Sequence, residues 1–227
     1  MPIRIMYFYE KEHLSPGDLV MDKIVCVGKN YLDHAKELGD IVPEKPVLFI
    51  KPRSVLRAAV DHEELFLSIP QNLGSLHYET EIVLRLDKGG YKLDIKDAEK
   101  AIGAVSIGLD MTLRDLQNSQ KKAGHPWTTS KVFPDCVVVG SWLRVSEFPD
   151  YLNEKFSFSL DDKIKQEGYG KNMRLSPAEC VAYISEFFPL AAGDLIFTGT
   201  PAGVGPVQAG QKGTLNFGSI RYSISWS

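Results

Sequence analysis

This 227-residue chain has little of what marks several common protein classes. Its three cysteines, Cys26, Cys136 and Cys180, include no CxxC pair, so neither a disulfide framework nor a zinc site is expected. Lysine and arginine form no long block and the formal net charge is −3, which argues against binding to a nucleic-acid backbone. The longest apolar runs, residues 101–109 and 136–143, are far shorter than the roughly 20 residues of a membrane-spanning helix. We therefore expect no nucleic-acid partner and no membrane partner.

The first residues also lack the features of an export or transit signal. Residues 1–12 have no apolar core and mix Arg4 with Glu10 and Glu12. Together with cysteines that are typical of buried thiols in a reducing compartment, this predicts a cytoplasmic location.

Glycine and proline, in contrast, are frequent, with 19 and 13 residues, and divide the chain into many short elements. No linker interrupts the chain, so we expect an N-terminal strand and lead-in over residues 1–22 and one catalytic domain over residues 23–227. Apolar patterns predict strands at 3–9, 23–27, 47–50, 77–86, 101–109, 137–142, 156–160, 164–166, 195–198, 214–217 and 220–226. Short helices are predicted at 31–38, 95–100 and 113–122. Together these elements predict a β-rich α+β fold with a rolled or sandwiched sheet and a few short helices.

Two helix starts carry capping signals. Ser176 precedes Pro177, with Glu179 at the third helical position, which predicts an N-cap. The helix that follows would turn four apolar residues toward the core: Val181, Ile184, Phe187 and Phe188. Thr112 and Asp115 have the spacing of a capping box, which favours a helix-terminal role for Asp115 over a catalytic one.

Three carboxylates form a candidate metal site. Glu79 and Glu81 are two apart on a predicted strand, so both leave the same face. Asp110 lies where the apolar strand 101–109 ends, a place that often holds functional side chains. The alternative is a solvated strand face and a simple turn residue. If the three converge, their oxygens suit Mg²⁺, Mn²⁺ or Ca²⁺ and leave positions open for substrate. His77 shares the carboxylate face, either as a supporting contact or as a surface residue.

Other candidates are weaker when taken alone. His34 and Glu37 are three apart on the predicted helix 31–38, so the carboxylate could orient a basic imidazole; an exposed charged helix is the alternative. The glycine-rich turn 198–205 offers N–H groups and hydroxyls to an anion but is no P-loop. Lys131 is either a surface lysine or a contact for an anionic substrate.

Taken in order, these pieces match a specific pattern. The motifs are Val27-Gly28-Lys29-Asn30-Tyr31-x-x-His34, Pro46-x-Leu-Phe-x-Lys51-Pro52, His77-x-Glu79-x-Glu81, Leu109-Asp110-Met-Thr-x-Arg114-Asp115-x-Gln117, Gly124-x-Pro126-Trp127-x-x-x-Lys131 and Thr198-Gly-Thr-Pro-x-Gly-Val-Gly205. The chain resembles the fumarylacetoacetate hydrolase family, in its short, single-domain branch that handles acylpyruvates and oxaloacetate. The resemblance extends from about Lys23 to the end of the chain.

This resemblance implies a mixed β-roll of the type found in the family's C-terminal domain, a homodimer, and Mg²⁺ or Mn²⁺ in the pocket. It places metal ligands on Glu79, Glu81 and Asp110, and catalytic roles on His34, Glu37 and Lys131. It places substrate contacts on Lys29, Asn30, Tyr31, Gln117 and Thr200. Two departures from the branch are Lys29, where arginine is frequent, and Val137, where proline often follows the cysteine.

The implied activity is hydrolysis of a C–C bond in an acylpyruvate, through a pyruvate enolate that a divalent cation stabilises. Three alternatives use the same site: decarboxylation of oxaloacetate, its tautomerisation, and hydration of a 2-oxo-enoate. A fourth is a non-catalytic metal-binding domain. In each catalytic case the partner is a small 2-oxo acid.

Overall fold

The computed structural model describes residues 21–32 and 45–227. The predicted strand 3–9 and most of the predicted helix 31–38 lie outside these residues. In the described part of the chain the helices are α2 (Ile95–Ala101), α3 (Arg114–Ala123), α4 (Thr128–Lys131) and α5 (Pro177–Ser185), with 3₁₀ turns η1 (Arg53–Val55) and η2 (Gly170–Asn172). Within the described residues, no helix is long and apolar enough to cross a membrane.

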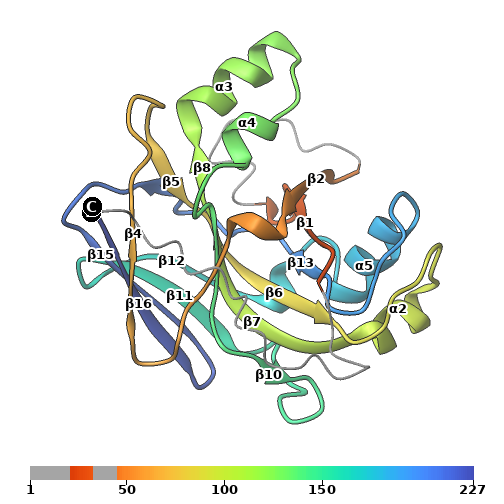
Figure 1. Ribbon diagram of the computed structural model, residues 1–227. Coiled ribbons are helices and arrows are strands. Elements are labelled where there is room, and N and C mark those ends of the chain that lie inside the picture. The colour runs from red at the N-terminus through yellow and green to blue at the C-terminus, as the bar shows by residue number, and fades with distance from the viewer. Residues whose placement is uncertain (1–20, 33–44) are drawn as a thin grey trace, which may run out of the picture.

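A mixed, eight-stranded sheet forms the centre of the molecule (Figure 1). Its main path runs β2 (Val47–Pro52), β1 (Lys23–Gly28), β13 (Leu195–Phe197), β6 (Thr80–Leu86), β7 (Ile102–Asp110), β9 (Val137–Val139) and β3 (Leu56–Ala58), and β10 (Leu143–Arg144) pairs with β7. Two of the pairs, β1 with β13 and β3 with β9, are parallel.

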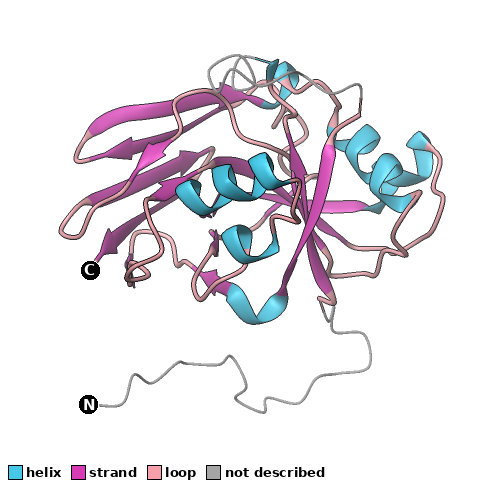
Figure 2. Cartoon of the chain, turned by 90° about the horizontal axis from the view of Figure 1, so that it is seen from above, coloured by secondary structure: helices cyan, strands magenta, loops and turns pink. Residues whose placement is uncertain are grey.

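Two smaller sheets complete the β-roll. The five-stranded sheet has the order β12 (Lys163–Tyr169), β11 (Lys155–Leu160), β15 (Lys212–Phe217), β16 (Ile220–Trp226) and β4 (Glu64–Leu67). The three-stranded sheet joins β14 (Gly205–Pro206), β5 (Leu76–Tyr78) and β8 (Thr112–Leu113). Seen from above, α3 and α4 lie on the near side, over the strands (Figure 2). The expectation of a β-rich roll with few helices is confirmed.

Burial decides between the two interpretations of the predicted strand 77–86. A solvated strand face was the alternative to a metal site, but Ile82, Val83 and Leu84 are fully buried and Glu81 is only 3 % exposed. Because β6 is an interior strand of the sheet, both of its faces are covered, including the face that carries Glu81 and Arg85. The predicted strand is also divided, since β5 ends at Tyr78 and β6 begins at Thr80. Glu79 occupies the break.

Both helices with capping signals form, α5 and α3, but only one of the two predicted caps is observed. Ser176 accepts from the Glu179 N–H and Glu179 accepts from the Ser176 N–H, so the capping box of α5 is confirmed. The helix ends at Ser185, before Phe187. Phe187 was predicted to face the core, but it is 54 % exposed. Thr112 does not cap α3, because it is paired within β8. Asp115 does lie in the first turn of α3, where it accepts from the Ser75 N–H at 2.8 Å.

Candidate functional site

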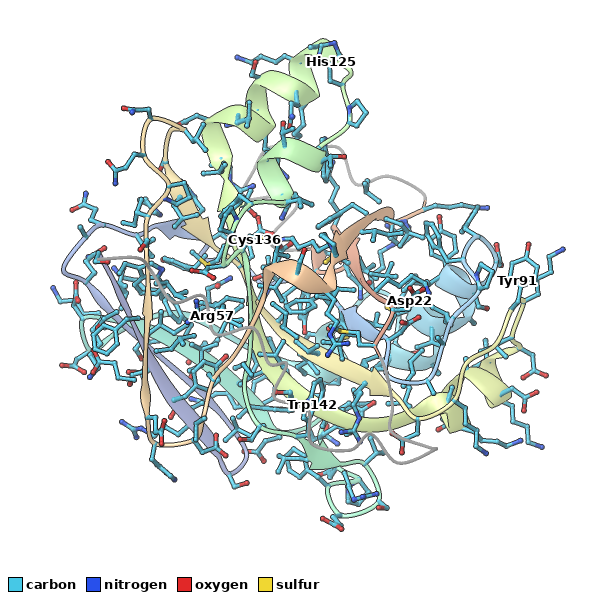
Figure 3. All side chains as sticks on the ribbon, in the orientation of Figure 1. Asp22, Arg57, Tyr91, His125, Cys136 and Trp142 are labelled. Carbon is cyan, nitrogen blue, oxygen red and sulfur yellow. The ribbon has the colours of Figure 1, made fainter. Side chains whose placement is uncertain are left out.

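A cleft lies where the break between β5 and β6, the end of β7, helices α3 and α4 and the turn after β13 meet. Its lining includes Glu79, Glu81, Asp110, Gln117, Lys131 and Thr200. Cys136, labelled in Figure 3, lies beside this region, and its carbonyl accepts from buried Lys51 at 3.0 Å. All three cysteines are buried, free thiols, as predicted.

Glu79, Glu81 and Asp110, here called the carboxylate trio, converge at the base of the cleft. One oxygen from each residue lies within 4.8 Å of the others, and all three side chains are buried. Backbone pairing sets this geometry, because β6 and β7 are antiparallel neighbours and the Asp110 N–H donates to the Glu79 carbonyl at 2.9 Å. The predicted convergence is therefore observed.

Three buried or nearly buried cations surround the trio. Lys131 Nζ donates to Glu79 at 2.8 Å, to Asp110 at 2.7 Å and to the Thr112 hydroxyl at 2.7 Å. Burial acts to lower the pKa of Lys131, but the charges of Asp110 and Glu79 outweigh it, so the pKa lies above its ordinary value. Lys131 is therefore an ammonium ion at neutral pH, and it is not the surface lysine that one interpretation allowed.

The other two cations, Arg114 and Lys51, each form an ion pair with one member of the trio. Arg114 forms a short ion pair with Glu79 and donates to the Gln117 amide oxygen at 2.6 Å. Lys51, in β2, is fully buried; its Nζ donates to the carbonyls of Met111 and Cys136 and lies 2.5 Å from Asp110 Oδ1. Lone lysines are rarely buried, so its position indicates a fixed electrostatic role.

The environment of Glu81 fits a divalent cation. Its carboxylate accepts from the Gly199 N–H at 2.6 Å, and burial together with the charges of Asp110 and Glu79 raises its pKa well above the ordinary value. A divalent cation among the three oxygens would relieve this repulsion, and an all-carboxylate donor set suits Mg²⁺, Mn²⁺ or Ca²⁺. His77, beside Glu79, is partly buried, and its pKa is lowered to about 4 by burial and then by Arg114.

The structure separates the predicted substrate contacts into two groups. Lys29, Gln117 and Thr200 line the cleft. Asn30 and Tyr31 do not line it. The Asn30 amide is buried against the carbonyls of Leu175 and Thr198, and the Tyr31 hydroxyl donates to a β12 carbonyl. These contacts give both residues a packing role. His34 and Glu37 lie outside the described residues, so their dyad stays a prediction.

Several lining residues had no role assigned from the sequence. Phe49 and Trp127 form an apolar wall, with ring centroids 6.2 Å apart, and Lys131 lies 4.8 Å from the Phe49 ring centroid. Lys121 also lines the cleft. Arg114 and Lys51 are within the quoted motifs, but no local signal marked either of them as part of the site.

Comparisons with known proteins identify the family of this chain. The Fumarylacetoacetate (FAA) hydrolase C-terminal family matches residues 23–222. Oxaloacetate tautomerase YcgM of Escherichia coli is 40 % identical over 201 residues, covering 88 % of this chain and 90 % of that protein. The mitochondrial oxaloacetate decarboxylase of Dictyostelium discoideum is 38 % identical over 191 residues, covering 83 % and 85 %. This chain therefore belongs to the fumarylacetoacetate hydrolase family, as its motifs indicated.

A solved structure extends the likeness to three dimensions. The fumarylpyruvate hydrolase of Pseudomonas aeruginosa, determined with Mn²⁺ and pyruvate, is 34 % identical and superimposes with a TM-score of 0.88. The match covers 94 % of this chain and 93 % of that one. Relatives in this family thus include both oxaloacetate enzymes and a hydrolase.

Proposed function

We propose that this protein is a divalent-cation-dependent enzyme that interconverts the keto and enol forms of oxaloacetate or a closely similar 2-oxo dicarboxylic acid. The observation that carries the proposal is the charge of the cleft base. Three carboxylates face three cations, Lys51, Arg114 and Lys131, so the protein charges cancel. A bound divalent cation would add two positive charges, and Lys29 and Lys121 in the lining add to them, so the cleft suits a substrate with two carboxylates such as oxaloacetate. The name of the E. coli relative supports the same substrate.

The side chains of the cleft have complementary roles in enolisation. A cation held by the carboxylate trio would supply a Lewis acid for the 2-oxo group. Lys131, kept protonated by Glu79 and Asp110, stabilises the negative charge that develops when the proton at C3 leaves. Arg114 binds the Gln117 amide oxygen, which leaves the Gln117 N–H groups to hold a substrate carboxylate. His34, oriented by Glu37, is the proposed base that removes the C3 proton.

Mg²⁺ and Mn²⁺ are the proposed cofactors. The trio offers hard oxygen donors, and a solved relative contains Mn²⁺. We keep the homodimer implied by the family resemblance as a proposal, and light scattering of the purified protein tests it.

Hydrolysis of an acylpyruvate is the second candidate. The apolar wall of Phe49 and Trp127 lies beside the trio and suits an acyl group, and the solved relative with bound pyruvate is named a fumarylpyruvate hydrolase. This reaction needs a water molecule, which His34 would activate. Both candidates place an enolate beside Lys131, so they differ in the fate of the enolate and not in the residues of the cleft base.

One protein preparation separates the two candidates. Loss of enol absorbance from oxaloacetate and release of pyruvate from acetylpyruvate and fumarylpyruvate are measured after chelation, with and without added Mn²⁺. If tautomerisation is the main activity, the rate with oxaloacetate depends on the cation and exceeds the rate of C–C cleavage at least tenfold. Faster pyruvate release would make the hydrolase the main activity. Glu154→Gln, at an exposed position, is the control for Glu81→Gln, which should lose both activities.

A further inference from the structure

Gln166 is a buried amide in an otherwise exposed stretch of strand β12. The strand residues from Lys163 to Lys165 and Glu167 are exposed, whereas Gln166 is only 1 % exposed. Its side chain reaches across to two parts of the cleft. The amide oxygen accepts from the Thr80 N–H at 2.9 Å, and the amide nitrogen donates to the Thr200 hydroxyl at 2.7 Å and the Pro201 carbonyl at 2.9 Å.

These contacts fix the orientation of the amide. The Thr80 N–H can only donate, so the group that faces it must be the amide oxygen. The Pro201 carbonyl can only accept, so the group that faces it must be the amide nitrogen. Two independent partners therefore require the same assignment, and the Thr200 hydroxyl must receive a hydrogen bond from Gln166.

The hydrogen-bond direction determines what Thr200 can do. Because the hydroxyl oxygen accepts from Gln166, its own proton is directed to another group, and Thr200 lines the cleft. A hydroxyl that is held in this way is a ready donor to an anionic oxygen. The contact also joins two parts of the site, because Thr80 lies between Glu79 and Glu81 whereas Thr200 lies in the glycine-rich turn.

The turn is packed closely onto β12. Gly203 has φ of +96°, and a Cβ there would lie 2.1 Å from the Lys165 carbonyl oxygen. The turn also donates its Gly199 N–H to Glu81 at 2.6 Å. Strand β12 is thus a rigid support on which the turn and the Glu79–Glu81 segment are aligned.

We propose that Gln166 is a positioning residue for substrate: it orients the Thr200 hydroxyl as a donor to a carboxylate of the bound 2-oxo acid. The inference rests on the proposed function, since it requires an anionic ligand in the cleft. Gln166 affects anion binding through the Thr200 hydroxyl and not through the stability of the fold.

A double-mutant cycle tests this coupling. Oxalate, a small dianion, is titrated by calorimetry into protein saturated with Mn²⁺, using Gln166→Met, Thr200→Val and the double variant. We expect Thr200→Val to weaken oxalate binding about tenfold or more, as for loss of a hydrogen bond to a charged group. Gln166→Met should weaken it severalfold alone and cause no further loss when Thr200 is already Val. Thr200→Ser, which keeps the hydroxyl, should retain most of the affinity.

The controls separate this inference from the proposed function. Gln71→Met changes an exposed glutamine and should leave oxalate affinity unchanged. Gln166→Asn, whose shorter amide cannot span both partners, replaces the Met variant if that variant unfolds. Additive losses in the double variant, or unchanged affinity in both Gln166 variants, would overturn the role of Gln166 while leaving the enzyme assignment intact. Wild-type protein that binds Mn²⁺ but no oxalate would contradict the proposed function itself, and the positioning role with it.

Discussion

At the scale of single residues, the site depends on buried charges that compensate one another. Lys131 touches two members of the carboxylate trio, and Arg114 and Lys51 each touch one. Removing one member of such a cluster leaves a buried charge without compensation, which costs more free energy than the original pair contributed. The cations therefore have both a structural and a chemical role, and substitutions can separate the two.

Lys131→Met should lose activity while keeping the cation site. The ammonium that stabilises the developing oxygen charge is absent, so we expect kcat to fall by about 10²-fold or more. Mn²⁺ should bind at least as tightly, because a positive charge 2.7–2.8 Å from two proposed ligands has been removed. Calorimetry with Mn²⁺ and oxaloacetate kinetics measure the two effects. Parallel loss of Mn²⁺ binding and activity would instead make Lys131 a structural residue.

Lys51→Met should destabilise the fold. The substitution leaves two buried carbonyls and one side of Asp110 without their partner, which costs about 3–5 kcal/mol in the free energy of unfolding. Urea denaturation measures this loss, and Lys96→Met, at an exposed position, should stay within about 0.5 kcal/mol of wild type. A loss below about 1 kcal/mol for Lys51→Met would show that water or rearrangement satisfies these groups.

The sequence was informative about the trio and much less so about its cations. Glu79 and Glu81 are two residues apart and Asp110 ends an apolar run, so local patterns made each a candidate, and the family resemblance grouped all three as ligands of one cation. Lys51 and Arg114 meet the trio only through the pairing of distant strands and helices. No local pattern distinguishes a buried lysine from an exposed one, and the role of Gln166 likewise depends on contacts 34 and 86 residues away in the chain.

At the scale of the elements, the strands follow from the apolar pattern and the helix ends from capping chemistry. The predicted helix 95–100 and the strand 101–109 match α2 and β7 closely, because each has a local signal that agrees with its packing. The capping spacing at Thr112 failed, because pairing with β5 took that residue into β8. Tertiary pairing thus overrode a local preference at the base of the cleft, where the buried Thr112 hydroxyl accepts from Lys131.

Ser176→Ala tests the element whose start the sequence predicted correctly. The variant removes the acceptor for the Glu179 N–H and one partner of the Glu179 carboxylate. We expect α5 to lose about 1 kcal/mol of stability, the usual cost of deleting a serine N-cap. Thermal unfolding measures the change, with Ser146→Ala at an exposed site as the control. An equal effect at both positions would mean that Pro177 and core packing alone define the helix start.

At the scale of the whole molecule, the roll closes two sheets over an aromatic core that excludes water from ionisable groups. Phe158 contacts both Tyr78 and Trp226, with ring centroids 4.4 Å and 6.4 Å away. The Tyr222 hydroxyl, fully buried nearby in β16, donates to the Ile107 carbonyl at 3.0 Å. This apolar packing disfavours the charged forms of buried ionisable groups, so their titration changes the free energy of unfolding.

The protein should lose stability as the pH rises above about 9. Burial raises the pKa of the Cys180 thiol, whose ordinary value is 9.0, and raises the pKa of the Tyr151 hydroxyl to about 12. The unfolded chain releases these protons at lower pH than the folded chain does, so the free energy of unfolding falls with rising pH. Urea denaturation between pH 7 and pH 10.5 measures it. A free energy of unfolding that stays constant or rises over this interval would contradict the burial of these groups.

The most direct test of the enzyme assignment is a cation titration of the keto–enol rate with oxaloacetate. Protein freed of metal by chelation should show little activity, and Mn²⁺ or Mg²⁺ should restore a saturable rate. Glu81→Gln, which replaces one of three carboxylates by a neutral amide, should need much more cation and reach a far lower rate. Full activity without any divalent cation, or an unchanged titration for Glu81→Gln, would contradict a metal-assisted reaction at the carboxylate trio.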